Sequence, residues 1–191
     1  RLAEAAGTRH CISCSSGTDA LILALLAKGL RPGQGVIVPS FTFAASAEVM
    51  PVLGAIPVFA EVDPATFNLD PAGLPAAMAA ARDDGIQVVG IIGVGLFGQP
   101  ADYPAIGAFA ESEGLWVIDD AAQSFGASHN GIPVGQLAER SPAQVSFRQS
   151  RLAAMATAAR CSPMMTARPR SCGPAASTAW ARRATRTSAS A

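Results

Sequence analysis

The sequence predicts an α/β fold of three layers, in which helices flank a mainly parallel sheet. Over the first 140 residues, short apolar runs rich in Val and Ile alternate with longer segments of helical periodicity. Several of the apolar runs end in Pro, Gly or Asp, as strands do before a loop. Half of the 191 residues are hydrophobic, which is enough for one core.

The strands are expected at residues 11–14, 35–38, 56–59, 88–93 and 115–119, and the helices at residues 18–28, 42–53, 72–82 and 103–113. The first helix has an apolar face formed by Ala20, Leu21, Ala24, Leu25 and the stem of Lys28. Gly29 and the Pro32-Gly33 pair end it. In such sheets ligands bind at the carboxyl ends of the strands.

Charge divides the chain at about residue 140. Residues 1–140 hold all fourteen acidic residues and six basic ones, whereas residues 141–191 hold eight arginines and no Asp, Glu or Lys. We interpret 1–140 as a partial domain and 141–191 as a disordered tail. A basic arm for nucleic acid is the alternative, but the tail offers only Phe147 and Trp180 for stacking, so we expect no nucleic-acid partner.

The chain has no apolar run of the ~18 residues that a membrane span requires, and no secretory signal. We therefore expect a cytoplasmic protein without a membrane partner. Because the first residue is Arg1 and not Met, we also expect that an N-terminal segment is missing.

The pair Cys11 and Cys14 has C-x-x-C spacing, which is typical of a redox pair or of half a zinc site. The other cysteines, Cys161 and Cys172, do not repeat this spacing. We favour the simpler interpretation, that C-I-S-C is a strand with small side chains.

Three segments carry candidate ligand-binding residues. Ser16, Gly17 and Thr18 follow a strand and open a helix, where free N–H groups suit a phosphate, although Ser-Gly-Thr is also an ordinary helix cap. Asp120 ends an apolar strand, where a buried carboxylate needs a partner: a protonated ring nitrogen, a helix end or a metal. Phe43 lies after the second strand, either over a flat ligand ring or in the core.

The motifs occur together in a specific order: C-I-S-C-x-x-G-T-D-A-L, P-S-F-T-F-A-A-S-A-E, V-D-P-x-T-F-N-L-D-P, G-L-F-G-Q-P-A-D and I-D-D-A-A-Q-S-F-G-A. This set resembles the DegT/StrS-type sugar aminotransferases over residues 8–139. The resemblance implies the large domain of a fold-type-I pyridoxal-phosphate (PLP) enzyme, incomplete here. It further implies a homodimer that transfers an amino group from glutamate to a nucleotide-linked keto sugar.

Carried over by position, the resemblance implies that Gly17 and Thr18 hold the PLP phosphate and that Phe43 stacks on the ring. Asp120 would pair with the pyridine nitrogen, and Gln123 would contact the ring hydroxyl. The sequence around C-I-S-C and A-A-Q-S-F-G-A is most similar to that of enzymes that install a 3-amino group on UDP-linked acetamido sugars or uronates for bacterial surface polysaccharide.

The family's Schiff-base lysine is missing. Relatives carry it in a stretch like S-F-F-P-A-K-P-L-G-C-Y-G soon after the D-A-A-Q segment, but the only lysine here is Lys28. Plausible GC-rich codons can be written for residues 144–165. When each triplet is instead begun at the third base of the original codon, these codons can encode the expected stretch. The lysine codon would then straddle Gln149 and Ser150. We therefore expect that the reading frame slips near Arg140, which also accounts for the acid-free tail.

Two further interpretations stay open for the chain itself. One is a non-catalytic fragment, or pseudogene product, that binds PLP or pyridoxamine phosphate (PMP). The other is a lysine-free sugar dehydratase, but such relatives place His where this chain offers Gln149 and Ser150. We expect an aminotransferase by family whose present chain has no catalytic residue and is inactive.

Overall fold

The structure is a computed structural model that describes residue 4 and residues 10–134, 145–148 and 154–158. Chain contacts divide the molecule into residues 1–161 and 162–191, and the second unit lies outside the described residues. The strands are β1 (His10–Cys14), β2 (Gly35–Pro39), β3 (Ile56–Ala60), β4 (Val88–Val94), β5 (Trp116–Asp120), β6 (Ser128–His129), β7 (Ile132–Pro133), β8 (Val145–Arg148) and β9 (Ala154–Ala158). The helices are α2 (Gly17–Ala27), α3 (Ala45–Val52), α4 (Leu74–Asp83) and α5 (Tyr103–Glu113), with short 3-10 turns η1 (Pro71–Gly73) and η2 (Leu96–Gly98).

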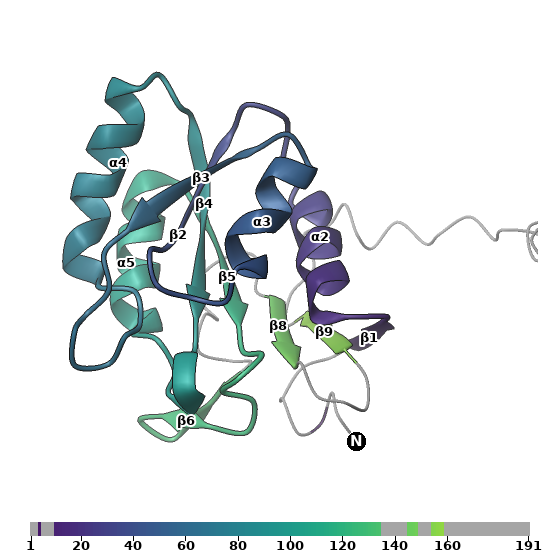
Figure 1. Cartoon of the computed structure of the whole chain (residues 1–191). Coiled ribbons are helices and arrows are strands. Elements are labelled where there is room, and N and C mark those ends of the chain that lie inside the picture. The colour runs from purple at the N-terminus through teal and green to yellow at the C-terminus, as the bar shows by residue number, and fades with distance from the viewer. Residues whose placement is uncertain (1–3, 5–9, 135–144, 149–153, 159–191) are drawn as a thin grey trace, which may run out of the picture. The chain divides into compact units, whose positions relative to one another are not determined.

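Seven strands form one sheet in the order β1-β9-β8-β5-β4-β2-β3 (Figure 1). Neighbouring strands from β3 to β8 are parallel, and β9 runs antiparallel to both β8 and β1. The mainly parallel sheet is therefore confirmed. The carboxyl ends of β1, β2, β4, β5 and β8 meet at one edge, as parallel strands require.

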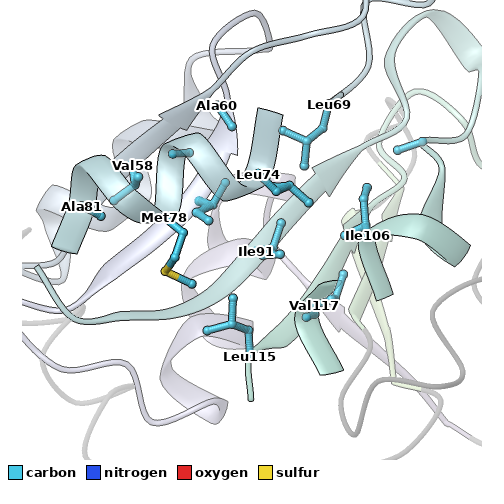
Figure 2. Close-up of a cluster of buried hydrophobic side chains, with 14 of the residues drawn as sticks. Val58, Ala60, Leu69, Leu74, Met78, Ala81, Ile91, Ile106, Leu115 and Val117 are labelled. Carbon is cyan, nitrogen blue, oxygen red and sulfur yellow. The ribbon is translucent and has the colours of Figure 1, made fainter. Parts of the chain in front are cut away.

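Helices cover both faces of the sheet. Helices α4 and α5 pack on one face around Ile91 and Val117 (Figure 2), and Ile37 belongs to the same core. Helices α2 and α3 pack on the other face, against Val36, Ile92 and Ile118. Successive residues of one strand serve opposite cores, because side chains alternate across a strand. This arrangement confirms the three layers.

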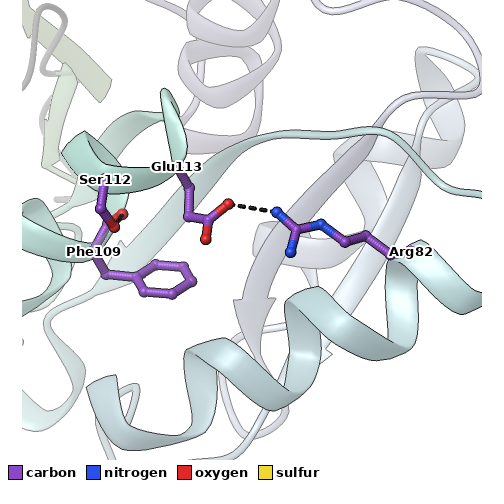
Figure 3. Close-up of polar contacts among 4 residues, drawn as sticks. All are labelled: Arg82, Phe109, Ser112 and Glu113. Atoms are coloured by element: carbon purple, nitrogen blue, oxygen red, sulfur yellow. Dashed lines mark hydrogen bonds and ion pairs between the residues drawn. The ribbon is translucent and has the colours of Figure 1, made fainter.

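One ion pair joins the outer ends of α4 and α5. The guanidinium of Arg82 donates to the carboxylate of Glu113 at 2.5 Å (Figure 3). The Arg82 side chain is 62% exposed, and exposed pairs contribute at most about 1 kcal/mol. The two helices are therefore held mainly by the apolar core beneath them.

The predicted elements between residues 11 and 119 are confirmed to within a few residues. The largest difference is at α3, which was expected from residue 42 and begins at Ala45. The structure also describes β8 and β9 within residues 141–191, where no element was expected; the rest of that segment lies outside the described residues. No helix in the described part of the chain combines the length and the apolar character of a membrane span.

The C-x-x-C pair lies on β1, as the simpler interpretation expected. Both cysteines are half-buried, and the thiol of Cys14 donates to the carbonyl of Ser16 at 3.4 Å. Burial raises the pKa of each thiol, so the reactive thiolate is disfavoured. Residues three apart on a strand point to opposite faces, so the two sulfurs are not placed to form a disulfide.

Candidate functional site

A pocket lies at the edge of the sheet where the parallel strands end. It is lined by the last residues of β4 and β5 and by residues that follow β1, β2 and β5: Gly17, Thr18, Leu21, Phe43, Ala45, Val94, Asp120, Ala122 and Gln123. All five residues singled out from the sequence are thus brought to one place. The chemical roles of these five residues stay predictions.

The start of α2 forms one wall of the pocket. Ser16 caps the helix by accepting the N–H of Asp19 at 3.1 Å, and its hydroxyl donates to the Asp19 carboxylate at 2.8 Å. Ser16 is therefore engaged in the cap, whereas the sequence suggested it as a phosphate donor. The N–H groups of Gly17 and Thr18 have no intrahelical acceptor, because they belong to the first turn. They are suited to bind an anion.

Asp120 forms the floor beside the end of β5. Its side chain is 5% exposed, and its Oδ2 accepts the hydroxyl of Ser46 at 3.0 Å. Its Oδ1 accepts the N–H of Ala122 at 3.1 Å. Burial raises the pKa of Asp120, against the lowering effect of those two hydrogen bonds. A cationic ligand atom beside this carboxyl group would favour the charged form.

Asp119 lies on the opposite face of the sheet and has a different environment. The hydroxyl of Tyr103 donates to Asp119 Oδ1 at 2.5 Å and also approaches the carbonyl of Gly93 at 3.1 Å. Both side chains are fully buried in the core between the sheet and α5. The sequence placed two carboxylates at this strand end, and the structure puts only Asp120 in the pocket.

Phe43 lies in the loop between β2 and α3 and is 56% exposed. The late start of α3 leaves residues 42–44 in this loop, so the aromatic ring borders the pocket and is not a core residue. Gln123 is exposed at the opposite wall, where its Oε1 accepts the N–H of Phe97 at 3.0 Å.

Two buried polar residues that hydrogen-bond to the surroundings of the pocket were missed from the sequence. Ser46 is 1% exposed and donates to Asp120. Asn68 is 2% exposed and hydrogen-bonds the loop that contacts Gln123. Each is a polar residue among mainly apolar neighbours in one of the motifs above (A-A-S-A and T-F-N-L). A polar residue in such a position could have indicated a buried hydrogen-bonding role.

Lys28 lies at the far end of α2 from the pocket. The eleven residues of this helix separate Lys28 from Gly17 by about 16 Å at 1.5 Å per residue. Its Nζ lies 5.8 Å from the centre of the Trp116 ring, at the amino end of β5. The side chain therefore belongs to the packing of α2 on the sheet.

The fold and the pocket together define an α/β protein with a pocket at the carboxyl edge of a parallel sheet. The chain belongs to the DegT/DnrJ/EryC1/StrS aminotransferase family, whose model matches residues 1–158. The match includes the 18 residues that follow Arg140.

Individual relatives agree with this family. The chain is 50% identical over 131 residues to the UDP-2-acetamido-2-deoxy-3-oxo-D-glucuronate aminotransferase of Pseudomonas aeruginosa, covering 69% of this chain and 35% of that protein. A family aminotransferase from Brucella abortus superposes with a TM-score of 0.75 at 38% identity, covering 86% of this chain and 45% of that one. NtdA from Bacillus subtilis, solved with bound cofactor PMP, has a TM-score of 0.70 at 28% identity, covering 84% and 35%.

The chain spans about a third of the length of the curated relative and less than half of each solved chain.

Proposed function

We propose that the pocket binds PLP or PMP, and that the chain derives from an enzyme that transfers an amino group to a nucleotide-linked keto sugar. When bound, PLP supplies an electron sink for the carbon attached to its aldehyde. The observation that supports this proposal is the convergence of an anion-binding helix start and a buried carboxyl group on one pocket.

Each predicted residue has a suitable task in this pocket. The N–H groups of Gly17 and Thr18 bind the phosphate, whose charge the helix start stabilises. Asp120 holds the proton on the pyridine nitrogen, and the hydroxyl of Ser46 orients its carboxylate. Phe43 covers one face of the ring, and Gln123 binds the ring hydroxyl.

We propose a UDP-linked 3-keto acetamido sugar or uronate as the ancestral substrate, used in bacterial surface polysaccharide. The support is the name of the relative at 50% identity. Glutamate as amino donor, a homodimer and a cytoplasmic location stay predictions from the resemblance.

We further propose that the 191-residue chain holds the cofactor without catalysing transfer, because Lys28 cannot reach the pocket. We also propose the slipped frame, with which the position of β8 is compatible. This strand pairs in parallel with β5, with Ser146 beside Asp119, and it ends at Arg148 on the pocket's edge of the sheet. The codon pair that would encode the lysine in the other frame comes directly after that strand.

The test is an absorbance titration of the 191-residue chain with PLP and with PMP. We expect saturable binding, and a loss of affinity of about tenfold or more in Asp120→Ala, because a charged hydrogen bond is worth ~1.5–3 kcal/mol. Glu48→Ala, an exposed acidic residue on α3, serves as the matched control and should bind normally. Binding that is absent, or unaffected by Asp120→Ala, contradicts the proposal.

A further inference from the structure

The side-chain amide of Gln123 has a fixed orientation at the pocket wall. Its partner is the backbone N–H of Phe97 at 3.0 Å, and an N–H group can only donate. The amide oxygen must therefore face Phe97. The other end of the amide, Nε2, is then a pure donor on a residue that lines the pocket.

The loop that supplies this N–H group adopts a constrained conformation. Phe97 lies in the left-handed region with φ of 55°, which costs a non-glycine residue about 1 kcal/mol or more. Such a conformation persists only where neighbouring contacts hold it. The orientation of Gln123 thus depends on what holds residues 96–100.

Asn68 holds this loop through three hydrogen bonds. Its Oδ1 accepts the N–H of Leu96 at 2.9 Å, and its Nδ2 donates to the carbonyls of Gln99 at 3.0 Å and Pro100 at 3.2 Å. The donor and acceptor demands of all three partners agree on one amide orientation. The side chain is 2% exposed, so a replacement leaves the loop's polar groups without equivalent partners.

We propose that Asn68 is a positioning residue that acts through the Phe97 N–H to present Gln123 Nε2 as a donor to an anionic oxygen of the ligand. This inference rests on the proposed function, in which that oxygen is the ionised ring hydroxyl of PLP. Asn68 does not line the pocket, so its effect must pass through the loop and Gln123. The pocket consequently selects a ligand with a negatively charged oxygen at this position.

The experiment compares PLP with 3-deoxypyridoxal 5′-phosphate, which lacks the ring hydroxyl. We expect the wild-type chain to bind PLP about tenfold more tightly than the deoxy analogue, the effect of one charge-assisted hydrogen bond. In Asn68→Ala this ratio should fall to about one. In Gln123→Glu it should fall to one or below, because the new carboxylate repels the ionised hydroxyl. The affinity for the deoxy analogue should change less than about twofold in both variants. The pH at which bound PLP shows the absorbance of its ionised hydroxyl should rise in both variants.

Further variants separate positioning from folding. Gln123→Glu keeps an oxygen for the Phe97 N–H but removes the donor. Asn68→Asp keeps the contact with the Leu96 N–H and removes the hydrogen bonds to the carbonyls of Gln99 and Pro100. It should therefore also lower the ratio, and it serves as the test if Asn68→Ala fails to fold. Asn130→Gly, at the other asparagine of the chain and at a φ of 51° that glycine adopts freely, is the matched control and should keep the wild-type ratio.

The outcomes distinguish the two proposals. Wild-type chain that binds neither ligand contradicts the proposed function. Wild-type chain that binds both ligands equally, or Asn68 variants that lose both affinities in parallel, overturns the positioning role and leaves cofactor binding intact. A double variant Asn68→Ala/Gln123→Glu with the same ratio as Gln123→Glu alone supports action through one path.

Discussion

Asp120 has its carboxyl group in a buried environment that disfavours the ionised form. Burial raises its pKa from 3.8, and the hydrogen bonds from Ser46 and Ala122 only partly offset the effect. A charged ligand nitrogen would supply the missing stabilisation. The residue that the proposed ligand needs is therefore one that the ligand-free fold accommodates at a cost.

Asp120→Asn should stabilise the ligand-free chain at neutral pH. Between pH 3.8 and the raised pKa, the native state binds more protons than the unfolded chain. The free energy of unfolding therefore falls as the pH rises through that window, by about 1.4 kcal/mol per unit of pKa difference. Asparagine keeps the acceptor for Ala122 and has no charge to bury, so this loss should disappear. Urea unfolding from pH 3 to 8 measures it, and a variant less stable than wild type at pH 7 contradicts it.

Ser46→Ala should act in the opposite direction. The variant leaves Asp120 Oδ2 without its hydroxyl donor, so the pKa of Asp120 should rise further. We expect a loss of about 1–3 kcal/mol of unfolding free energy at pH 7, and a smaller loss below pH 3. Thr42→Val is the matched control, because Thr42 approaches Ser46 only at 3.5 Å. A pH-independent loss would mean that Ser46 acts by packing alone.

Single residues were predictable from the sequence where a role depends on position along the chain. Gly17 and Thr18 start a helix after a strand, and Asp120 ends one, so their meeting follows from parallel topology. Ser46 and Asn68 act through contacts with residues 74 and 28 positions away. Such contacts depend on how separate segments pack, which the local pattern around either residue does not encode.

At the scale of elements, α5 matched its expected bounds because both of its ends have local signals. Asp102 caps its start by accepting the N–H of Ala105, and Gly114 ends it in the left-handed conformation. Helix α3 has no side-chain cap, and its start could not be placed from the sequence. Strand β9 pairs with β1, where Ala154 lies opposite Cys14 from 140 residues away, and β8 pairs with β5, where Ser146 lies beside Asp119. These strands are defined by their pairing with other segments and not by a local sequence pattern.

The contact between β4 and β5 depends on a glycine. A Cβ at Gly90 would lie 2.2–2.4 Å from the ring carbons of Trp116, so the indole lies directly on the β4 backbone. Gly90→Ala should therefore destabilise the chain by about 1–3 kcal/mol, because the ring or the strand must move. Thermal or urea unfolding measures the effect.

Gly107→Ala is the matched control for that substitution. Gly107 lies within α5 with open space around its Cβ position and no positive φ. Alanine there should raise the unfolding free energy by about 0.5–1 kcal/mol, since glycine weakens a helix interior. Equal destabilisation by the two alanines would show that contact with Trp116 is not the cause.

At the scale of the whole molecule, the site is assembled from segments that span residues 17 to 123, yet the chain's one lysine, Lys28, packs on Trp116 at the opposite end of the sheet. The fold thus places the proposed cofactor pocket apart from Lys28. Within the described residues, the cores on both faces of the sheet are built from residues 20–118. Cofactor binding and covalent attachment should therefore be separable in one scaffold.

A gene with the frame restored after codon 140 tests this separation. In our reading it encodes a lysine just after β8, whose last residue, Arg148, lies at the pocket's edge of the sheet beside β5. An amine there should condense with the PLP aldehyde, with loss of water, and borohydride should reduce the resulting carbon–nitrogen bond. Peptide mass analysis should then place the cofactor on that lysine, also in a Lys28→Arg background.

The 191-residue chain carrying Lys28→Arg should bind PLP reversibly and retain none after reduction. Cofactor fixed to Lys28 at equimolar PLP in the wild-type chain would mean that this side chain reaches the ring, which the length of α2 forbids.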